Sequence, residues 1–139
     1  MEIKYVDGWP QPYPLPDAEP YWKALQSQQL TYQKCQGCHD AIWPPHSVCP
    51  QCGSEELNWE QASGRGKVYS YSTVLRGPTP AWAEIAPYTV GFIEMEEGYY
   101  LFSQINAATP DDLKVGAPVT LDFLKRGDQI LPIFAITNR

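Results

Sequence analysis

Four cysteines in the sequence form two C-x-x-C pairs within one short stretch. The pairs are Cys35/Cys38 and Cys49/Cys52, ten residues separate them, and the chain has no other cysteine. Two such knuckles place four thiolates at the tips of two tight turns, which is the arrangement that a tetrahedral metal site requires. The spacing therefore predicts a zinc ribbon in which these four cysteines hold one zinc ion.

The context of the two pairs argues against redox work, because a thioredoxin-type C-x-x-C begins a helix in a βαβ unit and neither pair does. Iron stays open as the metal, since four thiolates also suit a rubredoxin-like iron site. His39 and His46 lie nearby, but four cysteines already complete a tetrahedron, so we expect both histidines outside the ligand set. A closed site offers substrate no open position, and the metal is expected to be structural.

No other catalytic motif is found in the sequence. It contains no P-loop, no G-x-G-x-x-G after a strand, no H-E-x-x-H and no G-x-S-x-G. With the cysteines committed to metal, no thiol nucleophile is left, and the carboxylates fall at an expected hairpin turn and helix start. We therefore predict no catalytic residue and no activity of the chain by itself.

The composition restricts the class of protein further. Its 139 residues are 43% hydrophobic and 13% aromatic, enough for the core of one ordinary domain. The net charge of -6 argues against a general nucleic-acid binder, which needs an excess of clustered Lys and Arg. No apolar run is long enough to cross a membrane and no secretory signal pattern is present, so we expect a cytoplasmic protein with reduced cysteines.

Local patterns divide the chain into segments that would position the metal site. Five prolines in residues 1–20 predict an extended arm. Residues 21–31 are predicted to form a short helix that takes Asp17 as its N-cap. Its apolar face, with Trp22 and Leu25, is narrow and must pack on another part of the chain. The zinc ribbon is expected over residues 32–62 and a β-barrel over residues 63–139.

Five short strands are expected in the barrel segment. Their sequences are "SGRGKVYSYSTVL", "PYTVGFIEM", "YYLFSQI", "APVTLDFL" and "QILPIFAIT". In the first, alternation predicts Tyr69 and Tyr71 on one face and Val68 and Ser70 on the other. The predicted fold class is therefore mainly β, with an N-terminal helix, a rubredoxin-like zinc ribbon and a five-stranded OB-fold barrel; a split sandwich is the alternative to the barrel.

A long, proline-rich loop over residues 76–87 follows the first expected barrel strand and carries Trp82 and Ile85. Large apolar residues on a loop indicate a binding surface, although collapse of the loop onto its own barrel is an equally ordinary explanation. With Trp22 of the helix, Trp82 and Ile85 are the candidate partner-interface residues.

The order of helix, zinc ribbon and small barrel resembles the acyl-CoA-associated zinc-ribbon/OB-fold family, thiolase-associated proteins formerly grouped as a domain of unknown function. The resemblance covers residues 21–25, 33–74, 87–98 and 111–123. Its most specific part is "PPHSVCPQCGS" running into "SGRGKVYSYS". Only the proline-rich arm falls outside it.

This resemblance implies an accessory subunit that binds a thiolase-like enzyme, an aldolase or a MaoC-like hydratase and helps form the access path of its CoA thioester. The catalytic residues would belong to the partner. Because CoA is anionic, Arg65, Lys67 and Arg76 around the first barrel strand are candidate contacts for its phosphates. Ordinary solvated surface charges are the alternative for all three.

Two further function classes stay open. Zinc ribbons and OB barrels often bind nucleic acid through aromatic stacking platforms, and the candidates for these are Tyr69, Tyr71, Tyr99 and Tyr100. The acidic balance of the chain counts against this alternative. A free-standing CoA-binding protein or acyl carrier is the other, and it would bind CoA without any partner.

Overall fold

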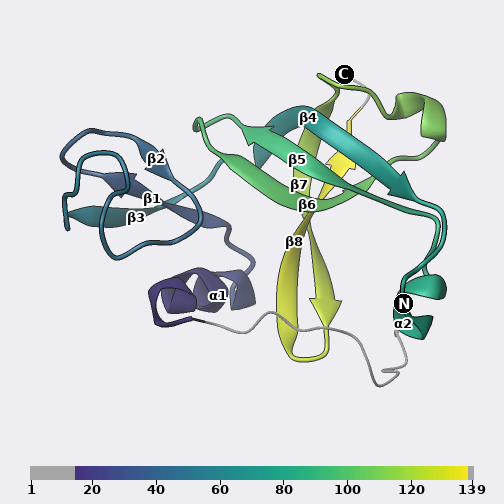
Figure 1. Ribbon diagram of the computed structural model, residues 1–139, viewed down its shortest axis with the longest axis horizontal. Helices are drawn as coiled ribbons and strands as arrows, with labels where there is room; N and C mark the ends of the chain where they lie inside the picture. The colour runs from purple at the N-terminus through teal and green to yellow at the C-terminus, as the bar shows by residue number, and fades with distance from the viewer. Residues whose placement is uncertain (1–14, 138–139) are drawn as a thin grey trace.

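The computed structural model describes residues 15–137 and consists of a three-stranded sheet and a closed five-stranded barrel, with an α-helix beside them and a second, shorter one in a barrel loop (Figure 1). The sheet has the strand order β2-β1-β3 and the barrel has the order β4-β5-β6-β8-β7. The elements are η1 (Pro16–Ala18), α1 (Glu19–Gln26), β1 (Thr31–Cys35), β2 (Ala41–Ile42), β3 (Leu57–Gln61), β4 (Arg65–Val74), α2 (Pro80–Ala83), β5 (Tyr88–Met95), β6 (Tyr100–Asn106), η2 (Pro110–Asp112), β7 (Pro118–Arg126) and β8 (Gln129–Ile136).

The mainly β fold with a five-stranded OB barrel is confirmed. Every barrel strand lies where its alternating pattern predicted, and the barrel closes through β6 and β8, which pair in parallel at Ile105 and Phe134. Closure excludes the split sandwich. Phe134 is fully buried at this seam, where its ring fills the interior of the barrel.

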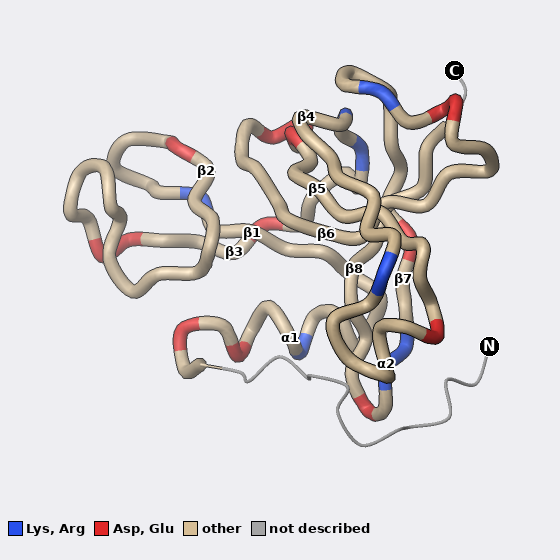
Figure 2. Tube along the Cα trace, turned by 45° about the vertical axis from the view of Figure 1, so that its right-hand side comes forward, with Lys and Arg blue, Asp and Glu red and all other residues tan. Residues whose placement is uncertain are grey.

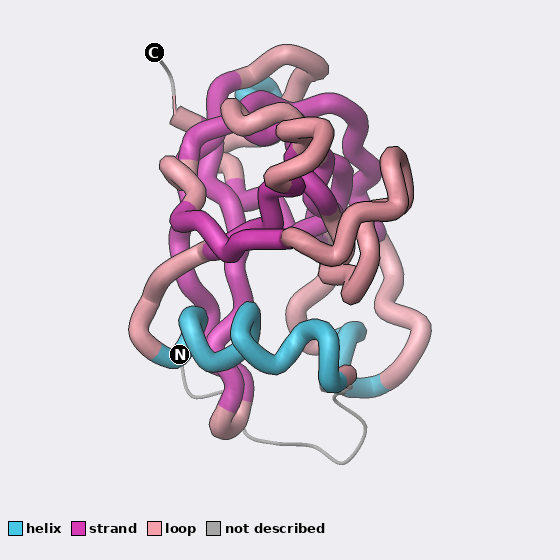
Figure 3. Tube along the Cα trace, turned by 90° about the vertical axis from the view of Figure 1, so that its left-hand side faces the viewer, coloured by secondary structure: helices cyan, strands magenta, loops and turns pink. Residues whose placement is uncertain are grey.

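The N-terminal helix is shorter than predicted. It ends at Gln26 because the backbone turns at Gln28, which has a φ of 57°, and carries Leu30 into the core. The Asp17 side chain does not cap it, since Asp17 lies within η1 and Ala18 occupies the N-cap position. Figure 3 shows α1 running below the sheet and the barrel, beside the tip of the β7–β8 hairpin. Residues 1–14 of the predicted arm lie outside the described residues.

The predicted alternation along β4 holds for Val68 and Tyr69 and is wrong from Ser70 onward. A β-bulge falls between Val68 and Ser70, so that Val68 pairs with the inward Ile93 while Ser70 pairs with the outward Phe92. The extra residue shifts the parity of the strand. Tyr71, which is still 40% exposed, therefore shares a face of β4 with Val68. It lies opposite Gly91, where a Cβ atom would come within 2.0 Å of the Ser70 carbonyl oxygen.

An aromatic cluster joins the helix, the sheet and the barrel into one core. Tyr32 of β1 stacks on Tyr99 of the β5–β6 turn, with ring centroids 5.1 Å apart. Trp43 lies 6.0 Å from Tyr99 and 4.7 Å from Tyr21 of α1. Tyr21, Tyr32 and Tyr99 are each at most 6% exposed, so the three parts of the chain cannot separate without opening this cluster. We call these four residues the aromatic junction.

Removal of one aromatic ring from the aromatic junction should lower the stability of the whole chain. For Tyr99→Ala we expect a loss of about 3 kcal/mol or more in the free energy of unfolding, because it leaves a cavity where three rings meet. Tyr99→Phe is the matched control. Its ring is retained, and the hydroxyl that it removes is buried without a hydrogen-bond partner among residues 15–137. Urea titrations of both variants measure this, and equal stability of Tyr99→Ala and wild type would contradict it.

The aromatic junction also predicts sensitivity to alkaline pH. Burial raises the pKa of Tyr99 and of Tyr21 far above the usual value of a tyrosine, whereas both ionise at about pH 10 in the unfolded chain. Stability should therefore be full below pH 10 and fall above it, by up to about 1.4 kcal/mol per pH unit for each tyrosine. Unfolding free energies measured from pH 8 to 11 test this, and Tyr99→Phe should show a shallower fall.

Candidate functional site

The four cysteines converge at the tip of the three-stranded sheet. Their Sγ atoms all lie within 4.8 Å of one another, although they come from two separate turns. The Sγ atoms of Cys35 and Cys52 are 3.5 Å apart and those of Cys38 and Cys49 are 3.7 Å apart. The predicted ligand set is therefore brought together, with the geometry of a four-thiolate metal site.

The two knuckles have the same backbone design. In the first, the N–H groups of Gly37 and Cys38 donate to Cys35 Sγ, and in the second the N–H of Gln51 donates to Cys49 Sγ. The residue after each knuckle has a positive φ, 65° at His39 and 79° at Gly53. Glycine adopts this conformation readily, whereas any other residue does so rarely, so nothing in the sequence marked His39 for this backbone role.

Neither histidine joins the thiols. His39 is exposed and shapes the turn through its backbone, while the backbone N–H and C=O of His46 are held by the side chain of Gln33, both at 2.8 Å. Gln33 is a buried residue of β1, so this pair of hydrogen bonds fixes the segment between the knuckles to the sheet. Among the described residues, the cluster of possible metal ligands consists of the four cysteines.

The surroundings of the cluster shift the pKa values of the Cys35 and Cys38 thiols in opposite directions. Backbone donation from Cys38, with further hydrogen bonds from Cys52 and Gly37, lowers the pKa of the Cys35 thiol to about 6. Although backbone donation from Asp40 opposes it, burial and hydrogen bonds with the Cys49 and Cys35 thiols raise the pKa of Cys38 to about 12. Holding all four cysteines as thiolates would therefore need a positive ion between them. The apolar core at this end of the sheet is also small, since its buried members are Cys35, Ile42 and Cys49. The site therefore serves as a structural metal site, and its ion holds the tip of the sheet together.

Removing one ligand should release the metal and unfold the tip. We expect Cys49→Ser to lose the ion that the wild type holds at about one per chain, with a lower melting temperature, because bound metal contributes on the order of 10 kcal/mol to such sites. Metal content by plasma mass spectrometry, together with the absorption spectrum that distinguishes iron from zinc, measures this.

The matched control is His39→Asn, which removes the imidazole while keeping a residue that tolerates a positive φ. Its metal content should equal that of the wild type. Metal retained in Cys49→Ser and lost in His39→Asn would show that the histidine is a ligand and contradict the four-thiolate assignment.

The loop over residues 76–87 folds back onto the barrel. It contains the short helix α2, and the ring of Trp82 lies 5.1 Å from that of Tyr88 and 5.2 Å from the guanidinium carbon of Arg126. Trp82 and Ile85 are both half-buried by this packing. Collapse of the loop onto the barrel thus explains why part of each side chain is buried. The role of the exposed parts in a partner interface stays a prediction.

Trp82 and Trp22 both line an apolar groove of about 290 Å³. We call it the tryptophan groove. Trp22 of α1, Trp43 of the ribbon and Trp82 of α2 line it, together with Phe102 and Leu131 of the barrel. Trp43 was missed by sequence reasoning because its partners lie far away in the chain. Two of the three predicted interface residues thus share one surface.

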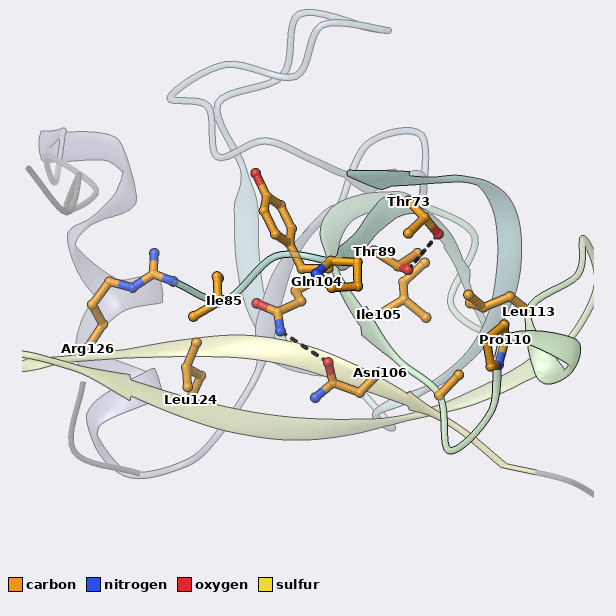
Figure 4. Close-up of a pocket in the computed structure, with 13 residues that line it drawn as sticks. Thr73, Ile85, Thr89, Gln104, Ile105, Asn106, Pro110, Leu113, Leu124 and Arg126 are labelled. Carbon is orange, nitrogen blue, oxygen red and sulfur yellow. Dashed lines mark hydrogen bonds between the residues drawn. The ribbon is translucent and has the colours of Figure 1, made fainter. Parts of the chain in front are cut away.

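Ile85 lines a different cavity of about 500 Å³, at the end of the barrel where the loops gather (Figure 4). Arg126 lies at one end of this cavity and Leu113 at the other, with the side-chain amides of Gln104 and Asn106 between them. The Gln104 amide donates to the Asn106 oxygen at 3.1 Å. The lining combines apolar walls with a few polar groups, as small-molecule sites commonly do.

The three basic residues nominated for phosphate contact are not gathered in one place. Arg65 forms an ion pair with Glu96 at 2.9 Å, and Lys67 forms one with Glu94 at 3.6 Å. Arg76 follows the opposite end of the ten-residue strand β4, on the order of 30 Å away from Arg65. Figure 2 shows Lys and Arg on several separate parts of the trace, with Asp and Glu between them. Phosphate contact by these residues stays a prediction.

The tyrosines proposed as stacking platforms divide in two. Tyr99 is 3% exposed within the aromatic junction, so it cannot stack on a base, and that assignment is wrong. Tyr69, Tyr71 and Tyr100 are between 40 and 56% exposed. The two-residue period of β-structure already places the adjacent Tyr99 and Tyr100 on opposite faces, a signal that the sequence contained.

Comparisons with known proteins place the whole arrangement in a family. The family described as "ChsH2, rubredoxin-like zinc ribbon domain" matches residues 22–58, and "ChsH2, C-terminal OB-fold domain" matches residues 59–124. A DUF35 domain-containing scaffold protein of Methanothermobacter thermautotrophicus is 37% identical over 106 residues, which cover 75% of this chain and 79% of that protein. This chain therefore belongs to the DUF35 family of ChsH2-type zinc-ribbon/OB-fold proteins.

Two other relatives carry more specific names. A solved structure described as "Ltp2-ChsH2(DUF35) aldolase" superposes with a TM-score of 0.81 at 33% identity, covering 91% of this chain and 98% of that chain. The probable enoyl-CoA hydratase alpha subunit of Thermomonospora curvata is 35% identical over 115 residues, 82% of this chain. This chain spans only 35% of the length of that hydratase subunit. None of the helices within residues 15–137 has the length and apolar character needed to span a bilayer.

Proposed function

We propose that this protein is a non-catalytic accessory subunit that binds a thiolase-like, aldolase or hydratase-like acyl-CoA enzyme. One observation carries this proposal. The solved DUF35 chain, described as belonging to an aldolase, superposes on this chain over 98% of its own length. The related hydratase protein is likewise named as a subunit. Two relatives named for different reactions share this fold, so the fold supports a role common to both, which is assembly with an enzyme.

The chemistry of the described residues is consistent with this role. Four thiols are occupied in a closed metal site, which we propose holds zinc, and a closed site cannot activate water or substrate. The cavity in Figure 4 is a reasonable place for part of a CoA thioester, because its paired amides can exchange hydrogen bonds with the amides of the pantetheine arm. The CoA thioester would then contact both this chain and the enzyme. Arg65, Lys67 and Arg76 are the candidate contacts for its phosphates.

A cytoplasmic location goes with the proposal. Four reduced cysteines held for metal binding suit a reducing compartment, which is also where acyl-CoA enzymes would meet the chain. The nucleic-acid alternative has less support, since Tyr99 is buried and a chain with a net charge of -6 lacks the excess of cations that nucleic-acid binding needs.

Affinity capture tests the proposal. The tagged full-length protein is used to capture partners from its native extract, treated with nuclease at moderate salt, and the bound proteins are identified by mass spectrometry. We expect one acyl-CoA enzyme in near-stoichiometric amount, and none with an unrelated tagged protein. Recovery of no such enzyme, with nucleic acid co-purifying when nuclease is left out, would contradict the proposal and favour the nucleic-acid alternative.

A further inference from the structure

We propose that the outer face of β4, β5 and β6 is the surface through which this chain docks onto its acyl-CoA enzyme. This inference rests on the proposed function and adds the surface that performs it. The surface, called the aromatic face below, consists of Tyr69, Phe92, Tyr100 and Phe102, one from β4, one from β5 and two from β6.

The four rings of the aromatic face are adjacent and already ordered. Phe92 and Phe102 are register partners across β5 and β6, and their centroids are 5.2 Å apart in an edge-to-face contact. Tyr69 and Tyr100 make the same kind of contact at 4.9 Å. Because each ring is held by its neighbour, a partner that covers the face would lose little conformational entropy in ordering these side chains.

Core packing does not explain the aromatic face. The strand neighbours Ile93 and Leu101 point inward and are at most 3% exposed, whereas Phe92 and Phe102 are 45 and 58% exposed. Exposed aromatic rings gathered on adjacent strands are unusual on the surface of a chain that acts alone, and they commonly mark an interaction site. Aromatic residues are also enriched at the energetic centres of protein interfaces.

The aromatic face continues into the tryptophan groove. Phe102 belongs to both, since its ring also lines the groove with Trp22 and Trp82. One apolar surface therefore runs from Tyr69 on β4 to α1, and it includes two of the residues predicted for a partner interface. A surface that crosses the barrel, the ribbon and the helix fits a large, folded partner better than a short peptide.

The charges beside the aromatic face favour a protein over a polyanion. Lys67, Glu94 and Tyr100 are register partners across three strands, and Lys67 pairs with Glu94 next to the rings. Arg65 pairs with Glu96 close by, and Glu97 adds one more carboxylate, so this end has no excess of cations. Strand β6 carries no charged residue at all. Nucleic acid requires uncompensated cations, whereas an apolar centre with a balanced polar rim is the pattern of protein interfaces.

The test compares Phe92→Thr/Phe102→Thr with the wild type. Threonine removes both rings but keeps the strand preference of a β-branched residue. The matched control is Val115→Thr, which changes a side chain that is 69% exposed in the turn before β7. Each full-length, metal-loaded protein is titrated by calorimetry onto the acyl-CoA enzyme that the wild type captures. We expect Kd to rise about tenfold or more for the double variant and to be unchanged for Val115→Thr.

Several outcomes would overturn the proposal, and each is distinct. An unchanged Kd of the double variant, with wild-type metal content and melting, would remove the aromatic face from the interface and leave the accessory function intact. Capture of no acyl-CoA enzyme by the wild type would remove the proposed function and this inference together. Loss only of self-association, followed by light scattering, would assign the face to a second copy of the chain. Loss only of single-stranded oligonucleotide binding would assign it to nucleic acid. If the double variant does not fold, Tyr100→Thr takes its place.

Discussion

Contact between Tyr32 and Tyr99 is the interaction on which the rest of the structure depends, because it joins two parts that could otherwise move as separate modules. The ribbon contributes Tyr32 and Trp43, the barrel contributes Tyr99, and α1 closes the cluster with Tyr21. All three buried tyrosines belong to one hydrophobic core with Val68, Ile93 and Phe134 of the barrel. The tryptophan groove exists only because this aromatic junction holds α1, the ribbon and the barrel at fixed positions. A surface that spans all three parts is therefore a property of the assembled core.

The metal and the aromatic junction stabilise opposite ends of the ribbon. At its base the sheet shares the core of the barrel, whereas at its tip the buried apolar residues are few and the thiols replace a core. Loss of metal should thus affect the tip first and leave the barrel closed. The aromatic face lies on the barrel, so the metal supports a partner surface indirectly, through the position of Trp43 and the groove.

Local patterns in the sequence were sufficient for the features that depend on neighbours in the chain. Knuckle spacing predicted the four ligands, and the two-residue period predicted five strands at their observed positions. The errors all involve contacts or backbone geometry that local spacing does not encode. One bulge between Val68 and Ser70 reversed the predicted faces of β4 from Ser70 onward, and Tyr99 was buried by rings from the ribbon and from α1. Trp43 was overlooked for the same reason, since its groove is formed by segments distant in sequence.

The proposed accessory function rests on the surfaces that the chain presents and on the metal site that its thiols form. The described residues offer a closed metal site, a cavity lined with amides, and an apolar surface with a balanced rim. These are the parts of a subunit that positions and completes a partner enzyme. The most direct measurement is the steady-state kcat/KM for an acyl-CoA thioester of the captured enzyme, alone and with one equivalent of this protein. The account predicts that this protein alone gives no turnover and raises kcat/KM of the enzyme; turnover by the isolated protein, or no effect on the enzyme, would contradict it.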